Sequence, residues 1–470
     1  DFKRIRRDKK ETRLDIAIRY YKTALNRDPE NQTALFGVGN AYFYQGQYLK
    51  ARQYYEDMLR INKKSVEGHA GLLNLYIERD VLPEVVSVHV TLQDKDLLTQ
   101  VPSPLLYKLA NYYLGKKRTD KVNIRLDYGI QSPRFKDLAD NPYPAVRTVL
   151  NALHQRDPEY PPLYVGFARL CREEKNLSLM ESYLQKAIKT EPGYFAALHL
   201  MGEYFYITKQ PVKCYDYLNR AVQASNAPPE FALEDFYRET ETVGKTYHMM
   251  GNVFYYFFDK VKAASRFGDE LEDEEDQENE VEQRANYEIA QTKYELARDE
   301  GYASSELSYN LGRVYYLKQQ YEKALEQWLD LYEDFVDNPE IMFALGNAFY
   351  HLDNLEASRG EYLKLIDSFE RKAEKIKTVY ASRGDHLKTF QSLAAAYNNM
   401  GAIYHRRGNE TKASVSYWKG IDYARRLERE NEFARVNLAR LLRPTGAPGK
   451  PVLDEGIPFS IPYYVKELRP

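Results

Sequence analysis

The chain has 470 residues, which is too long for one simple core and favours two or three domains or one elongated repeat array. Its 67 Lys and Arg nearly balance 69 Asp and Glu, and a net charge of −2 gives no global field for nucleic acid, so we expect none as a partner. Two cysteines exclude a disulfide framework, and no apolar run reaches the ~18 residues that a bilayer span needs.

Residues 1–13, DFKRIRRDKKETR, form a basic N-terminal segment with seven Lys or Arg. Such a cluster often flanks a membrane helix on one side, which would place a membrane anchor before residue 1. It is equally typical of a solvated helix start. Both interpretations stay open.

A fixed spacing of large, small and aromatic residues recurs between residues 14 and 440. A large residue, a small residue four positions later and an aromatic three beyond share one face of a first helix. Nine residues after the aromatic comes a small residue of a second helix, with a large residue four later. The first-helix small residues are Gly39, Gly202, Gly251, Gly312, Gly346 and Gly401. The pattern predicts helix pairs that approach closely at these glycines.

This spacing resembles the tetratricopeptide repeat family, whose unit is 34 residues. The steps from Gly39 to Leu73, from Ala168 to Gly202 and from Gly312 to Gly346 are each 34 residues. The resemblance implies an all-α fold, a right-handed superhelical solenoid of antiparallel helix pairs, with about nine to eleven units.

Changes of composition divide the chain into five predicted parts. The basic segment is followed by an N-terminal array (14–100), a divergent connector (101–140), a main array (141–440) and an extended, proline-rich tail (441–470). In the connector, LLYKLANYYL (105–114) fits a degenerate first helix. The main array carries an acidic insertion at 269–282, with ten acidic residues, which either extends two helices or forms a solvated loop. The tail is either disordered or docked on the array.

The common sequence motifs that indicate catalysis are absent from the sequence. There is no HExxH and no CxxC, and VGKT at 243–246 lacks the glycine of a phosphate loop because Glu239 stands there. The acidic run lacks the spacing of a calcium loop. We therefore expect no enzyme activity, no cofactor and no metal site.

The family resemblance implies that four positions of each first helix face a partner-binding groove. Carried onto this sequence, they are Phe36, Asn40, Phe43, Arg169, Arg172, His199, Tyr206, His248, Asn252, Tyr255, Tyr309, Arg313, Tyr316, Phe343, Asn347 and Tyr350. Aromatic rings and Asn amides suit an extended protein segment. The alternative is that these side chains only pack the inner wall. Some relatives clamp a chaperone's terminal carboxylate; Asn40 fits that site, but Gly71 replaces a second Asn and disfavours such a role.

The leading hypothesis is a non-catalytic scaffold or adaptor that binds proteins or peptide segments as a subunit of a larger assembly. One alternative is a chaperone or carrier of extended segments, with residues 443–470 as an internal competitor. Another is the docking region of a larger enzyme. A weaker similarity to spirochaete collar proteins of periplasmic flagellar motors implies the bacterial periplasm or envelope, with the cytoplasm as the alternative. No oligomeric state is predicted.

Overall fold

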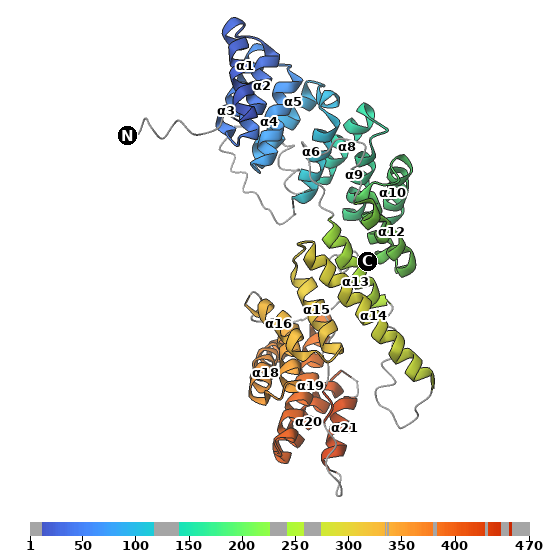
Figure 1. Ribbon diagram of the computed structural model, residues 1–470. Coiled ribbons are helices and arrows are strands. Elements are labelled where there is room, and N and C mark those ends of the chain that lie inside the picture. Colours follow the sequence, from blue (N-terminus) through green and yellow to red (C-terminus); the bar gives the residue numbers. More distant parts are fainter. Residues whose placement is uncertain are drawn as a thin grey trace. The chain divides into compact units, whose positions relative to one another are not determined.

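The computed structural model describes residues 12–116, 141–225, 242–257, 274–333, 335, 338–378, 383–427, 431–442 and 451–453. Within these ranges the chain forms twenty α-helices and one 3₁₀-helix, and it contains no strand (Figure 1). The prediction of an all-α fold is confirmed.

The chain divides into two compact units, residues 1–204 with 216–241 and residues 205–215 with 242–470. The helices up to the boundary are α1 (Arg13–Arg27), α2 (Gln32–Tyr44), α3 (Tyr48–Ile61), α4 (Val66–Glu78), α5 (Leu82–Asp94), η1 (Leu98–Gln100), α6 (Ser103–Gly115), α8 (Tyr143–Arg156), α9 (Pro161–Glu173), α10 (Leu177–Thr190), α11 (Phe195–Ile207) and α12 (Pro211–Ala224). The boundary passes through α11 and α12.

The second unit continues the same alternation of first and second helices. Its helices are α13 (Val243–Phe257), α14 (Glu274–Asp299), α15 (Ser305–Leu317), α16 (Tyr321–Tyr332), α17 (Pro339–His351), α18 (Leu355–Thr378), α19 (Arg383–Arg406), α20 (Glu410–Arg425) and α21 (Glu432–Leu441).

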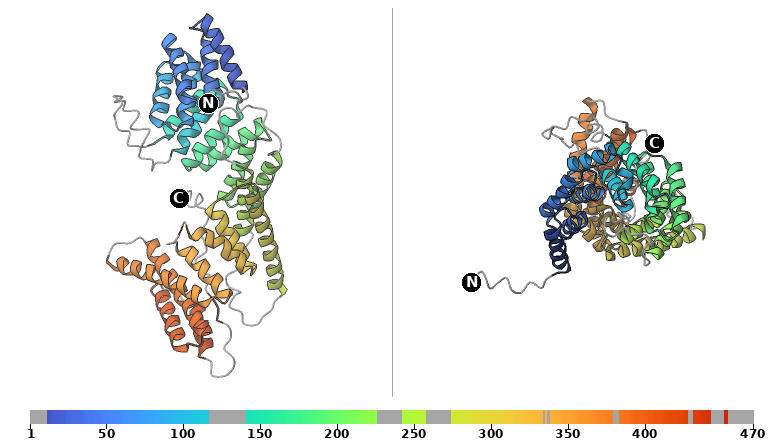
Figure 2. Two further views of the ribbon diagram at one scale, coloured as in Figure 1. Left: turned by 60° about the vertical axis from the view of Figure 1, so that its left-hand side comes forward. Right: turned by 90° about the horizontal axis from the view of Figure 1, so that it is seen from above.

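Consecutive helices pack as pairs in both units. In the first unit α2 packs on α3, α4 on α5, α6 on α8 and α9 on α10. In the second unit the pairs are α13 with α14, α15 with α16, α17 with α18 and α19 with α20, and the further views of Figure 2 show the same stacking. The predicted solenoid of antiparallel helix pairs is confirmed within each unit. Eight such pairs lie within the two units, and α11 and α12 lie at the boundary between them.

Five of the recurring first-helix glycines, Gly39, Gly251, Gly312, Gly346 and Gly401, lie against an aromatic ring of a second helix. A Cβ atom added at Gly39 would lie 2.6 Å from the ring of Tyr55, and one added at Gly251 would lie 2.4 Å from the ring of Tyr294. The same holds in the next pairs, where Gly312 faces Trp328. Any side chain larger than glycine would force these rings away, so the predicted role of the small residue is confirmed.

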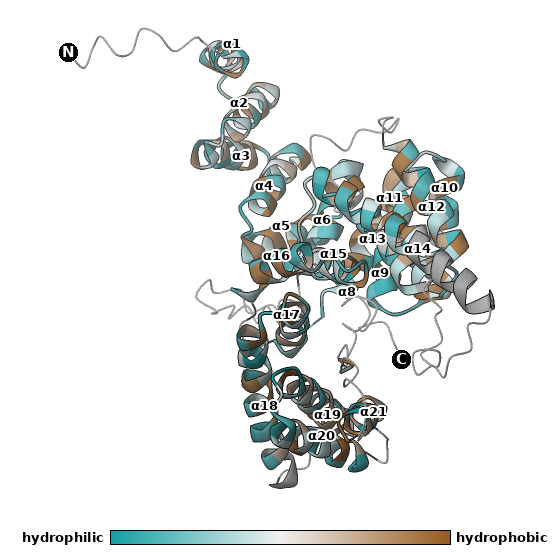
Figure 3. Ribbon diagram, turned by 60° about the horizontal axis from the view of Figure 1, so that its bottom comes forward, coloured by the Kyte–Doolittle hydropathy of each residue, from teal (hydrophilic) through white to brown (hydrophobic). Residues whose placement is uncertain are grey.

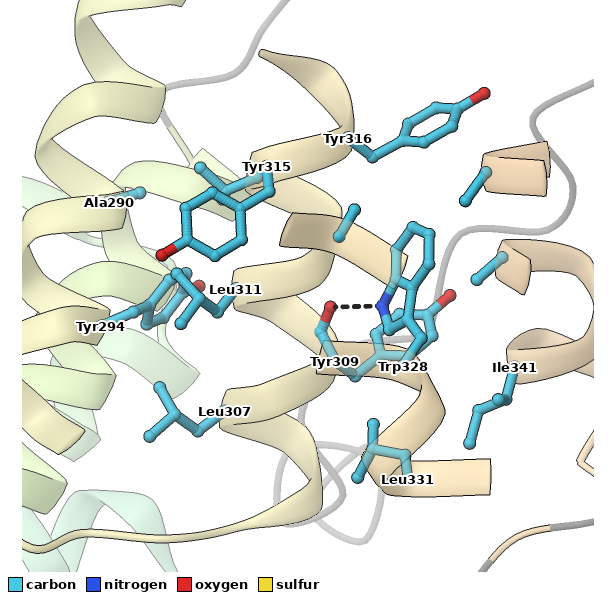
Figure 4. Close-up of a cluster of buried hydrophobic side chains, with 14 of the residues drawn as sticks. Ala290, Tyr294, Leu307, Tyr309, Leu311, Tyr315, Tyr316, Trp328, Leu331 and Ile341 are labelled. Atoms are coloured by element: carbon cyan, nitrogen blue, oxygen red, sulfur yellow. Dashed lines mark hydrogen bonds between the residues drawn. The ribbon is translucent and has the colours of Figure 1, made fainter. Parts of the chain in front are cut away.

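The helices are amphipathic, with polar and apolar residues on the same helix (Figure 3). Around α15 and α16 the apolar faces meet in a core that includes Tyr294, Leu311 and the fully buried Trp328 (Figure 4). The indole Nε1 of Trp328 donates a hydrogen bond of 3.2 Å to the backbone oxygen of Tyr309. The largest ring of this core therefore has its polar atom satisfied.

The turn from first to second helix uses one residue in the left-handed region. Gly46 and Gly408 take this position with φ of 71° and 68°. Other pairs place a non-glycine residue there, as at Asp80, Lys175 and Gln319. The residue after it donates its N–H to the carbonyl five residues back, as Gln47 does to Tyr42 at 2.9 Å, which closes the first helix tightly.

Several predicted parts lie partly outside the described residues. These are residues 1–11 of the basic segment, 117–140 of the connector, 269–273 of the acidic insertion, and the tail apart from 441–442 and 451–453. The connector begins with α6, which packs on α8, and residues 274–282 begin α14. The five-part division stays a prediction.

Candidate functional site

The sixteen predicted groove residues all lie on first helices, and none of them is exposed. Ten are buried, namely Arg169, His199, Tyr206, His248, Asn252, Tyr309, Tyr316, Phe343, Asn347 and Tyr350. The other six are half-buried, namely Phe36, Asn40, Phe43, Arg172, Tyr255 and Arg313. Packing of the wall accounts for this burial, and binding of a partner by these residues stays a prediction.

The three predicted asparagines accept hydrogen bonds from tyrosines of second helices. The hydroxyl of Tyr55 donates to Oδ1 of Asn40 at 2.7 Å, and that of Tyr294 donates to Oδ1 of Asn252 at 2.8 Å. Tyr362 makes the same bond to Asn347. Each asparagine directly follows the glycine that admits the same ring, so one Gly-Asn step fixes both the packing and the polar end of the tyrosine.

These asparagines also connect neighbouring pairs. Nδ2 of Asn310 donates to Oδ1 of Asn252 at 3.0 Å, and Nδ2 of Asn399 donates to Oδ1 of Asn347 at 3.0 Å. Because all four side chains are buried, the bonds replace the water contacts that the amides lose on folding. They specify the order in which first helices stack.

A half-buried carboxyl group adjoins one of these links. Glu306, in the first turn of α15, accepts from Nδ2 of Asn252 at 3.2 Å. Burial raises the pKa of Glu306 to about 7, against the lowering effect of that hydrogen bond. Burial also lowers the pKa of His248 to about 3, so this ring is neutral. Charge is thus disfavoured inside this part of the second unit.

Both predicted arginines of α9 have intramolecular partners. Nη1 of Arg169 donates to the hydroxyl of Tyr107 at 2.7 Å and to Oδ1 of Asn111 at 2.6 Å. Arg172 forms an ion pair of 3.1 Å with Glu203, whose side chain is 3% exposed. Such bonds orient both cations within the first unit.

The predicted aromatic residues pack mainly against other rings. The ring centroids of Phe36 and Tyr55 are 6.1 Å apart, and those of Phe43 and Tyr48 are 5.7 Å apart. Tyr255 contacts the ring of Tyr287, and both Tyr309 and Tyr316 contact the ring of Trp328. Phe343 contacts Tyr362, and His199 contacts Phe195. Nε of Arg313 donates a hydrogen bond of 3.3 Å to the hydroxyl of Tyr255. The guanidinium group of Arg406 lies 4.7 Å from the centre of the Tyr350 ring. Burial of Tyr206 raises the pKa of its hydroxyl.

An open cleft of about 610 Å³ lies in the first unit, between the pairs α2–α3 and α4–α5. Its apolar lining comes from Tyr48, Leu49, Leu75, Tyr76 and Val81. Leu49 is 85% exposed, the highest exposure among the large apolar residues of the described chain. A concave surface with exposed apolar side chains is the usual form of a binding site.

Charged groups surround this apolar lining. Lys50, Arg52, Arg79 and Glu84 complete the cleft, so cations outnumber anions by three to one. The Arg79 guanidinium lies 5.5 Å over the ring of Tyr48, and that of Arg52 lies 5.9 Å over the ring of Tyr76. Tyrosine and arginine are the residue types that contribute most at protein interfaces. The cleft therefore has the composition of an interface for a protein partner.

A second binding geometry occurs near the end of the second unit. Here Asn437 of α21 exchanges two hydrogen bonds with the backbone of Val452: Val452 N donates to Oδ1 at 2.7 Å, and Nδ2 donates to Val452 O at 2.6 Å. Nδ2 of Asn398, on α19, reaches the same oxygen at 3.2 Å. These helices therefore hold Val452 through its backbone N–H and carbonyl groups.

Sequence reasoning missed the cleft and the pairing of asparagine with tyrosine. It left open that the tail docks on the array, as Val452 does, but did not identify the residues involved. The pairing does have a sequence signal, because Asn40 and Asn347 each precede their tyrosine by fifteen residues. The cleft has none, since its lining comes from turns and helix ends of two pairs. Residues 451–453 carry no periodic pattern that would have predicted their docking.

Two features are absent from the described residues. Nowhere in them do three or more His, Cys, Asp or Glu side chains gather as a metal-binding group. None of the described helices combines the length and apolar character that crossing a bilayer requires.

Comparison with known proteins gives a family match. The tetratricopeptide repeat family model matches residues 3–65, 282–337 and 318–372. No curated protein matches the sequence.

Three solved structures with similar chains differ in how much of this chain they cover. The C-terminal part of a TPR repeat-containing protein from Cytophaga hutchinsonii is 15% identical over 66% of this chain and 99% of that chain, with a TM-score of 0.40. The Pseudomonas aeruginosa pilF protein is 14% identical over 49% and 86%, with a TM-score of 0.36. The Cut9–Hcn1 assembly of the APC/C is 12% identical over 91% and 82%, with a TM-score of 0.34.

Proposed function

Since the chain belongs to the tetratricopeptide repeat family, we propose that it is a non-catalytic scaffold that binds a partner protein in the cleft between α2–α3 and α4–α5. Repeats of this family support protein–protein interaction in general. The observation that carries the proposal is the cleft itself, where an exposed leucine lies among tyrosines and arginines. The partner presents an acidic and apolar surface, because this complements the lining.

The test compares two double variants of the first unit. L49D/R79E places two new negative charges in the cleft. R60E/I61D places the same two changes at the other end of α3, where Arg60 and Ile61 are exposed and lie outside the cleft lining. Chemical cross-linking and affinity capture from the source cells would identify proteins that bind the full chain.

The proposal predicts that a protein cross-linked to cleft residues in the wild-type chain is lost from L49D/R79E and retained by R60E/I61D. Equal capture by all three proteins would contradict a role for the cleft. Circular dichroism of each variant shows whether its helices are intact, so loss of fold is distinguished from loss of binding.

We also propose that the scaffold works in a larger assembly at the bacterial cell envelope. The basic segment 1–13 supports this location, since such clusters often lie beside membranes. Fractionation of source cells tests it. Recovery with the envelope fraction is expected, and recovery only in the soluble cytoplasm would contradict it.

A carrier of extended segments is the second candidate function. The backbone contact at Val452 favours it, because the second unit already holds this residue of its own chain through its N–H and carbonyl groups. The docking region of a larger enzyme stays a prediction from the sequence, as does a flagellar motor.

A further inference from the structure

Residues Pro451–Leu453 occupy a position that a separate chain segment could equally take. Val452 makes its hydrogen bonds through its backbone N–H and carbonyl, with Asn437 and Asn398. Backbone groups are common to all residues except proline, which lacks the N–H. The hydrogen bonds thus select an extended conformation and not a particular side chain at Val452.

Hydrogen bonds to other side chains of the array also hold these asparagines in position. Nδ2 of Asn437 also donates to Oδ1 of Asn398 at 3.0 Å, and Nδ2 of Asn398 donates to Oδ1 of Asn399 at 3.0 Å. Asn399 in turn bonds Asn347 and Tyr362. All three asparagines of this series are fully buried. Their amide orientations are therefore fixed by the protein, which reduces the entropy that binding costs.

Without a chain segment, the hydrogen-bonded residues Asn398, Asn399 and Asn437 would leave amide atoms of Asn437 without their backbone partner. Oδ1 of Asn437 accepts from Val452 N, and its Nδ2 donates to Val452 O. A buried amide that loses such partners is unfavourable unless water or another segment replaces them. A single backbone residue, Val452, satisfies both the donor and the acceptor of this amide at once.

Leu453 provides the side-chain contact next to this backbone pair. It is 8% exposed and belongs to the core cluster that includes Phe343, Phe390 and Met400. An apolar residue directly after the paired residue is thus required, whereas the paired residue itself is not specified by hydrogen bonds. This combination of backbone bonds and one apolar pocket is a known mode of recognising extended peptides.

We propose that Asn398, Asn437 and the apolar residues around Leu453 form a binding site for an extended protein segment. Residues 451–453 are its exchangeable internal occupant. The occupant from outside is an extended partner segment with a large apolar residue directly after the paired one. The proposal rests on the protein-binding function above, but it concerns the second unit and is independent of the cleft.

The experiment uses the full chain and a fluorescent peptide of residues 447–457, APGKPVLDEGI. In the variant L453D the internal segment has a charged residue in place of its apolar anchor. We expect the peptide to bind L453D at least about tenfold more tightly than it binds the wild type, as read by fluorescence anisotropy. A scrambled peptide of the same composition is the control.

Changes in the peptide test the contacts without altering the protein. N-methylation of the peptide's Val452 removes the N–H that bonds Asn437, and Leu453→Asp removes the anchor; each should weaken binding to L453D at least about tenfold. Replacement of the peptide's Val452 by Ile should leave affinity within about threefold. In the protein, adding N437A to L453D should abolish binding, with circular dichroism to check the fold.

Failure of the peptide to bind L453D more tightly than the scrambled control would overturn the proposal and leave residues 451–453 as a fixed end cap. Equal binding of the N-methylated peptide would also overturn it. Either result leaves the proposed function intact, since partner capture by the cleft is measured with L49D/R79E and R60E/I61D. Conversely, loss of the cleft's role would not alter peptide binding here.

Discussion

Single side chains decide how neighbouring helices join in this protein. Glycine followed by asparagine, as in Gly39-Asn40 and Gly346-Asn347, admits a tyrosine ring and binds its hydroxyl. A buried tyrosine hydroxyl without a partner would lose hydration without compensation, so the asparagine stabilises the ring that the glycine admits.

Tyr362→Phe isolates this hydrogen bond because the ring is kept. We expect the variant to lose about 1–3 kcal/mol of unfolding free energy, since the fully buried hydroxyl contacts both Asn347 and Asn399. The control is Tyr332→Phe, whose hydroxyl accepts from the exposed Lys364, and which should change stability by less than about 0.5 kcal/mol. Urea denaturation followed by circular dichroism measures both; equal losses would contradict a special role for the Asn–Tyr pair.

Glu306 makes the second unit sensitive to pH. Burial raises its pKa from 4.5 to about 7, so the folded state favours the protonated form more than the unfolded state does. Stability from this group is therefore present below about pH 4.5 and is lost as pH rises to 7. Glu306→Gln lacks this titration. We expect the stability of Glu306→Gln relative to the wild type to increase by up to about 3 kcal/mol between pH 5 and 8. A constant difference across that range, in urea melts at each pH, would argue against the shift.

Helix ends follow a common design, with a left-handed residue between the first and second helix of a pair. Gly408 has φ of 68° and open space around its α-carbon, while Gly360 lies inside α18, also with open space. The two sites differ in backbone conformation and not in crowding.

Alanine at these two glycines should therefore have opposite effects. Gly408→Ala forces a Cβ into the left-handed region and should cost about 1 kcal/mol. Gly360→Ala improves helix propensity and should stabilise by up to about 1 kcal/mol. Thermal melts of the two variants measure this, and a shift of both melting temperatures in the same direction is the outcome that the helix-end design does not allow.

Over the whole chain, the sequence predicted the helix pairs because small and aromatic residues make local, periodic contacts. It did not predict which side chains stay exposed, because a helix face is covered or left free by the neighbouring pair. His199 and Asn252 look like groove residues in the sequence, and they are fully buried. Leu49 was overlooked, since its exposure depends on turns of two separate pairs.

The most direct measurement of the proposed scaffold function is hydrogen–deuterium exchange on the full chain, alone and bound to the protein it captures. The account predicts slower exchange on binding at residues 46–52 and 75–84, which surround the cleft. Unchanged exchange in both segments, with protection only elsewhere, would contradict the cleft as the binding site.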